Sequence, residues 1–91
     1  MSLAKIETAS TVSLTATGAT SQITDAGNDS TADIIASAVT LNAVQGVGST
    51  GANGSLDIDA TTINATNTTL SGIFLNSVGT GGVTVSAKAQ T

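Results

Sequence analysis

Two short groups of acidic residues have the residue types and spacing to bind a metal ion or to act as acid and base. Asp57 and Asp59 are two positions apart, so on a β-strand both carboxylates point to the same side, about 7 Å from each other. Asp25 and Asp29 flank a turn that also contains Asn28. Oxygen ligands of this kind suit calcium. All four aspartates are therefore calcium candidates, and the simpler interpretation is an exposed polar strand face and a turn held by side-chain hydrogen bonds.

Catalysis has little support in the composition. The chain has no histidine, cysteine, tyrosine or tryptophan, and it has no arginine either. The usual nucleophile–base pairs and all metal sites built on nitrogen or sulfur are thereby excluded. We therefore predict a protein that is not an enzyme, with no catalytic residues and no cofactor apart from the possible calcium ion.

The charge and hydropathy of the chain limit its partners. The net charge of −4 argues against nucleic acid and against an anionic membrane surface. No apolar run approaches the roughly 20 residues that span a membrane, and residues 1–5 do not resemble a secretory signal. Two interpretations remain open, namely a small protein without a signal and a piece of a longer exported chain.

A short pattern of alternating residues recurs along the chain and indicates its architecture. The order is aliphatic, polar, aliphatic, polar, small, and it occupies residues 12–16, 39–43, 56–60, 73–77 and 83–87, where only Phe74 departs from it. Alternation of this kind is typical of a β-strand with one buried face. Weaker strand signals occur at residues 23–26, 33–36 and 62–65. Because no segment has the apolar period of a helix, we predict an all-β protein.

The spacing of the strand patterns favours a stack of coils. Val39, Leu56 and Ile73 follow one another at equal intervals, and Ile34 lies midway between Val12 and Leu56. We therefore predict a parallel β-solenoid (β-helix) of about four coils, with successive strands about 4.8 Å apart. The alternative is an antiparallel β-sandwich. Residues 1–91 would form one domain, with residues 1–10 a flexible start or a tag and residues 11–88 the stacked strands.

The equal interval from Val39 to Leu56 and from Leu56 to Ile73 also predicts which side chains stack. Leu14, Leu41, Ile58 and Leu75 would form an inward ladder. On the outer surface, Asn42, Asp59 and Asn76 occupy the same slot of the pattern and would form a polar ladder, which stabilises stacked parallel strands. A saccharide-binding strip is the functional interpretation of this ladder.

Part of the chain resembles a known family of repeats. Residues 39–43, the glycine-rich residues 46–48 and 51–54, and residues 69–76 resemble repeats of filamentous-haemagglutinin-like bacterial surface adhesins and related exoproteins. The resemblance covers about residues 12–87. It implies a right-handed parallel β-helix, export to the cell surface, and a role as a stalk or adhesive shaft.

The sequence thus predicts a structural function. We expect a non-catalytic β-solenoid segment or fibre-forming subunit of a bacterial surface or extracellular protein. The pattern at residues 83–87 is as apolar as the interior ones, which predicts end-to-end association into homo-oligomers or filaments, or neighbouring coils beyond this chain. The alternative is a β module that binds carbohydrate, such as surface glycans, or calcium.

Overall fold

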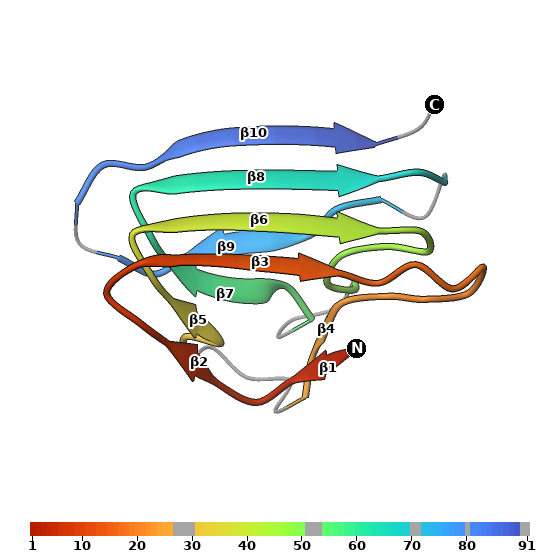
Figure 1. The fold of residues 1–91 in the computed structure, drawn as a ribbon, viewed down its shortest axis with the longest axis horizontal. Helices are drawn as coiled ribbons and strands as arrows, with labels where there is room; N and C mark the ends of the chain where they lie inside the picture. The colour runs from red at the N-terminus through yellow and green to blue at the C-terminus, as the bar shows by residue number, and fades with distance from the viewer. Residues whose placement is uncertain (27–30, 51–53, 70–71, 80, 90–91) are drawn as a thin grey trace.

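The chain folds as a stack of parallel coils in a computed structural model (Figure 1). The structure describes residues 1–26, 31–50, 54–69, 72–79 and 81–89, and these contain β-strands but no α-helix. The stack makes about 3 turns and measures 32 × 22 × 19 Å. The predicted β-solenoid is confirmed, with slightly fewer turns than expected.

Three parallel sheets form the sides of the stack. The first pairs β1 (Ser2–Leu3) with β4 (Thr24–Asp25), and bridges from Ile23 to Val47 and from Val47 to Ile73 extend it. The second has the order β2 (Ile6–Glu7), β5 (Ile34–Ile35), β7 (Leu56–Asp59), β9 (Leu75–Ser77). The third has the order β3 (Thr11–Thr15), β6 (Ala38–Ala43), β8 (Thr62–Asn67), β10 (Thr84–Ala89). Because all strand pairs among the described residues are parallel, the β-sandwich alternative is wrong.

The number of residues between paired positions in successive turns differs from the equal interval that the sequence pattern predicts. Along the third sheet, Val12 pairs with Val39, Val39 with Ile63, and Ile63 with Val85. The first two steps are longer than either interval of the sequence pattern, whereas the last step equals the longer one, from Ile34 to Leu56, so the steps become shorter toward the end of the chain.

The predicted inward ladder is correct only in its first half, where Leu14 pairs with Leu41. Ile58 and Leu75 belong to the second sheet. The reason is that the patterns at residues 56–60 and 73–77 lie on a different side of the coil from the patterns that contain Leu14 and Leu41.

Two parts of the fold come from segments with weak or unexpected strand signals. The weak signals correspond to β4, β5 and β8, and β8 lies between β6 and β10 in the third sheet. The structure also places β1 and β2 within residues 1–10, where the sequence predicts a flexible start or a tag. Both strands pair with the second turn of the stack, so this segment is part of the solenoid.

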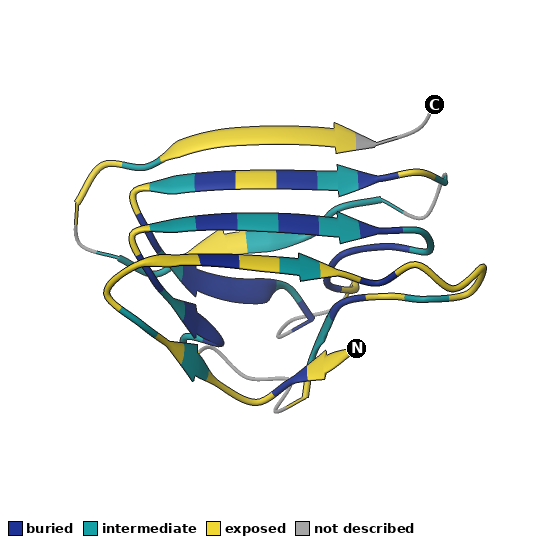
Figure 2. Ribbon diagram, in the orientation of Figure 1, coloured by how far each residue is buried: buried dark blue, intermediate teal, exposed yellow. Residues whose placement is uncertain are grey.

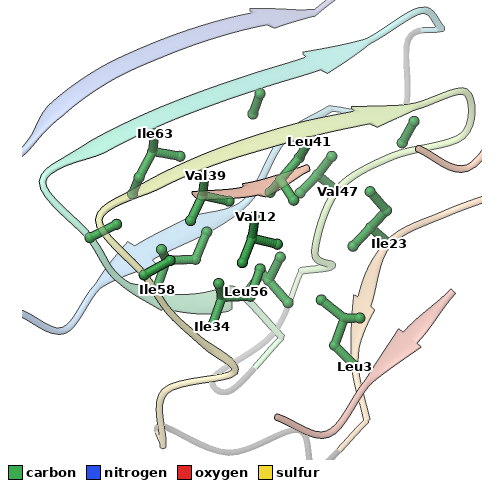
Figure 3. Packing of buried hydrophobic residues seen from close by; sticks show 14 of the residues in the cluster. Leu3, Val12, Ile23, Ile34, Val39, Leu41, Val47, Leu56, Ile58 and Ile63 are labelled. Carbon is green, nitrogen blue, oxygen red and sulfur yellow. The ribbon is translucent and has the colours of Figure 1, made fainter. Parts of the chain in front are cut away.

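The core is a thin column of aliphatic side chains between the three sheets (Figures 2 and 3). Its fully buried members come from all three sides of the coil: Ile23, Ile34, Val39, Leu41, Val47, Leu56, Ile58 and Ile63. Alanines are buried near the ends of three strands, at Ala16, Ala43 and Ala60, where the chain turns a corner. Layers of this kind need no aromatic side chain, because each turn buries its aliphatic residues against the next turn.

One glycine is required where two turns approach closely. Gly48 has a positive φ of 69°, which a residue with a Cβ rarely adopts. A Cβ at this position would also overlap the carbonyl oxygen of Phe74 in the next turn. The approach is fixed by backbone hydrogen bonds, since the Gly48 N–H donates to Ile23 and the Phe74 N–H donates to Val47. Gly48 therefore permits the irregular first side of the coil to stack.

The register predicts that shortening two paired leucines to alanine lowers the free energy of unfolding by different amounts. Leu41 is fully buried in the middle of the stack, whereas its register partner Leu14 is only partly buried in the first coil. Leu41→Ala should lower the free energy of unfolding by about 2–5 kcal/mol, as cavities in a packed core do, and Leu14→Ala should cost less. Urea unfolding of both variants, followed by circular dichroism, measures the difference. Equal costs would contradict this packing.

Candidate functional site

Three carboxylates lie together at one side of the stack. Asp25 belongs to β4, Asp33 immediately precedes β5, and Asp57 belongs to β7. One carboxylate oxygen from each of the three residues lies within 4.8 Å of the other two. Asp33 and Asp57 each retain only 2% of their accessible surface, and Asp25 is partly exposed. We refer to these three residues as the acidic cluster.

The strand register of the second sheet brings Asp33 and Asp57 together. Ile34 pairs with Ile58, so the aspartates that precede these two isoleucines also lie side by side. The backbone N–H of Asp33 donates to the carbonyl oxygen of Asp57 at 2.7 Å, and the N–H of Asp57 donates to Oδ2 of Asp33 at 2.9 Å. In the next turn, Nδ2 of Asn76 donates to Oδ1 of Asp57 at 2.8 Å. Asp33, Asp57 and Asn76 therefore form a polar ladder.

The acidic cluster concentrates negative charge in a buried place. Among the described residues the single ion pair joins Lys5 and Glu7, 3.4 Å apart, and both side chains are exposed. Oδ2 of Asp57 is buried and has no hydrogen-bond partner among the described residues. A buried charge without compensation costs several kcal/mol. A proton or a cation is therefore needed to offset the charge of the acidic cluster.

The raised pKa of Asp33 indicates that a proton offsets part of the negative charge of the acidic cluster. Burial of the Asp33 carboxyl raises its pKa from 3.8 to about 6, and a hydrogen bond with the neighbouring Asp25 carboxyl and the charges of Asp25 and Asp57 act in the same direction. The backbone N–H of Asp57 opposes the increase. A hydrogen bond between two carboxyl groups requires that one of them holds a proton, and at neutral pH this proton is only weakly held.

The acidic cluster contains only part of the predicted calcium candidates. Asp25 and Asp57 come together, although the sequence assigns them to separate groups. Asp59 lies outside the cluster. Its Oδ1 lies beside Gly79, 2.5 Å from the position that a Cβ on that residue would take. Asp29 lies outside the described residues. Asp33 was missed, and the signal that could have identified it is its position as the first residue of a weak strand signal.

The predicted polar ladder of Asn42, Asp59 and Asn76 is not formed. Asn42 lies on β6, where its neighbours are Thr15 and Thr66. Asp59 lies on β7 and pairs with Ile35. Asn76 is on β9, in register with Asp57. The three residues share a slot in the sequence pattern, but they belong to strands on two sides of the coil.

An open depression next to the first side of the coil contains the single aromatic residue of the chain. It has a volume of about 270 Å³ and is lined by Gln22, Gln45, Gly48, Ser49, Thr50 and Phe74. Phenylalanine, glutamine, serine and threonine are residue types that suit the binding of a sugar ring. Binding of surface glycans stays a prediction, and this depression is the place to examine for it instead of the polar ladder.

Comparison with family models, with curated proteins and with solved structures found no match for this chain. The resemblance to the haemagglutinin-like repeats therefore stays a prediction. Within the described residues, no helix has the length and hydropathy needed to cross a membrane.

The raised pKa of Asp33 predicts a pH dependence of stability. Because the pKa is higher in the folded state than its ordinary value, the folded protein binds this proton more tightly than the unfolded chain does. The contribution of Asp33 to the free energy of unfolding should therefore fall as the pH rises from about 4 through about 6, by about 3 kcal/mol at most.

Urea unfolding between pH 4 and pH 7, in buffer that contains a chelator, measures this contribution as the difference between wild type and Asp33→Asn. The wild type should lose more stability than the variant over this range. Asp59→Asn is the control and should retain the wild-type pH dependence. The same slope in wild type and Asp33→Asn would contradict the assignment.

Proposed function

We propose that this chain is a structural, non-catalytic β-solenoid unit whose last turn is covered by another coil. In this role it acts as a segment or a fibre-forming subunit of a bacterial surface or extracellular protein. The extracellular location rests on the resemblance to haemagglutinin-like repeats. The assignment as a structural protein is supported by the absence of histidine and cysteine from the sequence and by a fold in which most residues serve to repeat one coil.

The exposed inner face of β10 is the observation that carries the proposal. Val85 is 50% exposed, whereas its register partners in the same ladder, Val39 and Ile63, are 0% and 1% exposed. Ala87 is also exposed, although Ala65 in the strand below it is buried. Figure 2 shows that β10 is exposed along its described length, in contrast to β6 and β8. The inward-facing residues of β10 are therefore of the types found in the core, but no further layer of the stack covers them.

The edge of β10 can continue the stack by pairing with a further parallel strand. β10 pairs on one side with β8 and occupies the end of its sheet. At the other end of the same sheet is β3, which contains no charged residue. If β3 of a second copy paired with β10, Val12 would add the next valine to the ladder above Val85. The outer edge of β10 leaves a row of backbone N–H and C=O groups without a neighbouring strand, and such a row is a template for pairing.

Pairing of this kind would produce a linear assembly. The two ends of the stack are different surfaces, so the contact is head-to-tail, and a head-to-tail contact without ring closure generates a filament. In a longer protein, an adjacent coil of the same chain would bury the same face of β10. Both arrangements serve the same structural role, which is to extend a shaft.

The proposal predicts that a charge at Val85 blocks association. The wild-type protein should form larger particles as its concentration increases, and Val85→Lys should remain monomeric, because a lysine at the interface would have to lose its hydration. Asn64→Lys places the same charge on an exposed residue of the neighbouring strand β8 and should associate like the wild type.

Sedimentation velocity over a range of concentrations, with circular dichroism to confirm that each variant folds, compares the three proteins. A wild-type protein that stays monomeric at millimolar concentration would contradict the self-associating form of the proposal. Equal association of wild type and Val85→Lys would show that β10 is not the contact.

A further inference from the structure

We propose that Asp25, Asp33 and Asp57 bind one calcium ion that connects the second and third turns of the solenoid. This inference goes beyond the structural role, because it assigns a ligand to a site inside the stack. It is also independent of association at β10, so either proposal can fail without the other.

The first observation is the convergence of the three carboxylates. Asp25 and Asp33 come from the second turn and Asp57 from the third, and a carboxylate oxygen of each lies within 4.8 Å of the others. An ion at the centre of three oxygens at this limit would lie about 2.8 Å from each, so movements of a few tenths of an ångström would bring all three to calcium–oxygen distances of about 2.3–2.6 Å. Once this cluster has lost its shared proton, three carboxylates held together without a positive charge repel one another.

The second observation is an unsatisfied atom. Asp57 is 2% exposed, and its Oδ2 has no hydrogen-bond partner among the described residues. Its other oxygen is held in place by Nδ2 of Asn76. Buried polar atoms in folded proteins almost always have a partner, and a cation is the partner that a carboxylate oxygen in an acidic cluster lacks.

The chemistry of the ligands favours calcium over other metals. All three residues offer oxygen, and the sequence has no histidine or cysteine that would favour zinc or copper. Oδ2 of Asp33 and Oδ1 of Asp57 already accept hydrogen bonds, so the three carboxylates supply fewer than the 6–8 oxygens that calcium takes and water would complete the set. Calcium accepts an irregular set of ligands, whereas magnesium demands a nearly regular octahedron.

A calcium ion here would take the place of a covalent cross-link. The chain has no cysteine, so no disulfide can connect its turns. The ion would bind the folded stack and not the unfolded chain, in which the three aspartates are far apart, and such a ligand stabilises the native state. The hydrogen bond from Asn76 would extend this connection to β9 in the last turn.

Direct binding and thermal unfolding test the proposal. Protein freed of metal with a chelator should bind one calcium per chain in equilibrium dialysis. Its Tm should rise by about 5–10 °C at ten times the dissociation constant, compared with potassium chloride at the same ionic strength. The salt comparison is needed because screening of the net negative charge alone raises stability.

Substitutions then locate the ion. Asp33→Asn and Asp57→Asn should each lose the calcium-dependent rise in Tm, and both should fold without metal because they remove a buried charge. Asp59→Asn is the matched control, since it removes a neighbouring carboxylate outside the acidic cluster, and it should retain the full response. An absence of calcium binding to the wild type at 10 mM, or an unchanged response in Asp33→Asn and Asp57→Asn, would overturn the proposal.

Discussion

The parallel register of Val12, Val39, Ile63 and Val85 is the constraint on which the rest of this structure depends. Each strand in this ladder places an aliphatic side chain above the one before it, so one turn buries the next. The steps between paired residues differ in length from one turn to the next, and the connecting segments at the corners take up this variation. The core therefore stays regular although the number of residues per turn varies.

The same register creates the two chemically unusual features of the molecule. Pairing of Ile34 with Ile58 in the core brings Asp33 next to Asp57. Continuation of the ladder to β10 leaves Val85 exposed at the end of the stack. In each place one group lacks a partner among the described residues: Oδ2 of Asp57 accepts no hydrogen bond, and Val85 has no apolar layer over it. The proposed calcium ion and the proposed neighbouring coil supply these partners.

The alternating pattern was sufficient to predict the fold class but not the register. Residues 56–60 have the same pattern as residues 39–43 but contribute to a different sheet, because alternation shows that one face is buried and does not tell which side of a coil the strand occupies. The same ambiguity limits what could be predicted of the site. Asp25 and Asp57 were candidates from local spacing alone, whereas their proximity depends on strands that are far apart in the sequence. Asp33 was not a candidate, because only the pairing of β5 with β7 brings its carboxylate to the other two.

The most direct test of the account is a disulfide engineered across the register. The chain has no cysteine, so a pair of introduced cysteines reports on one contact without interference. Asn42 and Thr66 are register partners on β6 and β8, at the separation of adjacent strands that a disulfide can bridge. Asn42→Cys combined with Thr66→Cys should oxidise to an intramolecular disulfide in the folded protein, as seen by mass spectrometry. Asn42→Cys combined with Asp59→Cys, the pair that the equal intervals of the sequence pattern would bring together, should remain reduced. The opposite result would contradict the register from which both the acidic cluster and the exposed end of the stack follow.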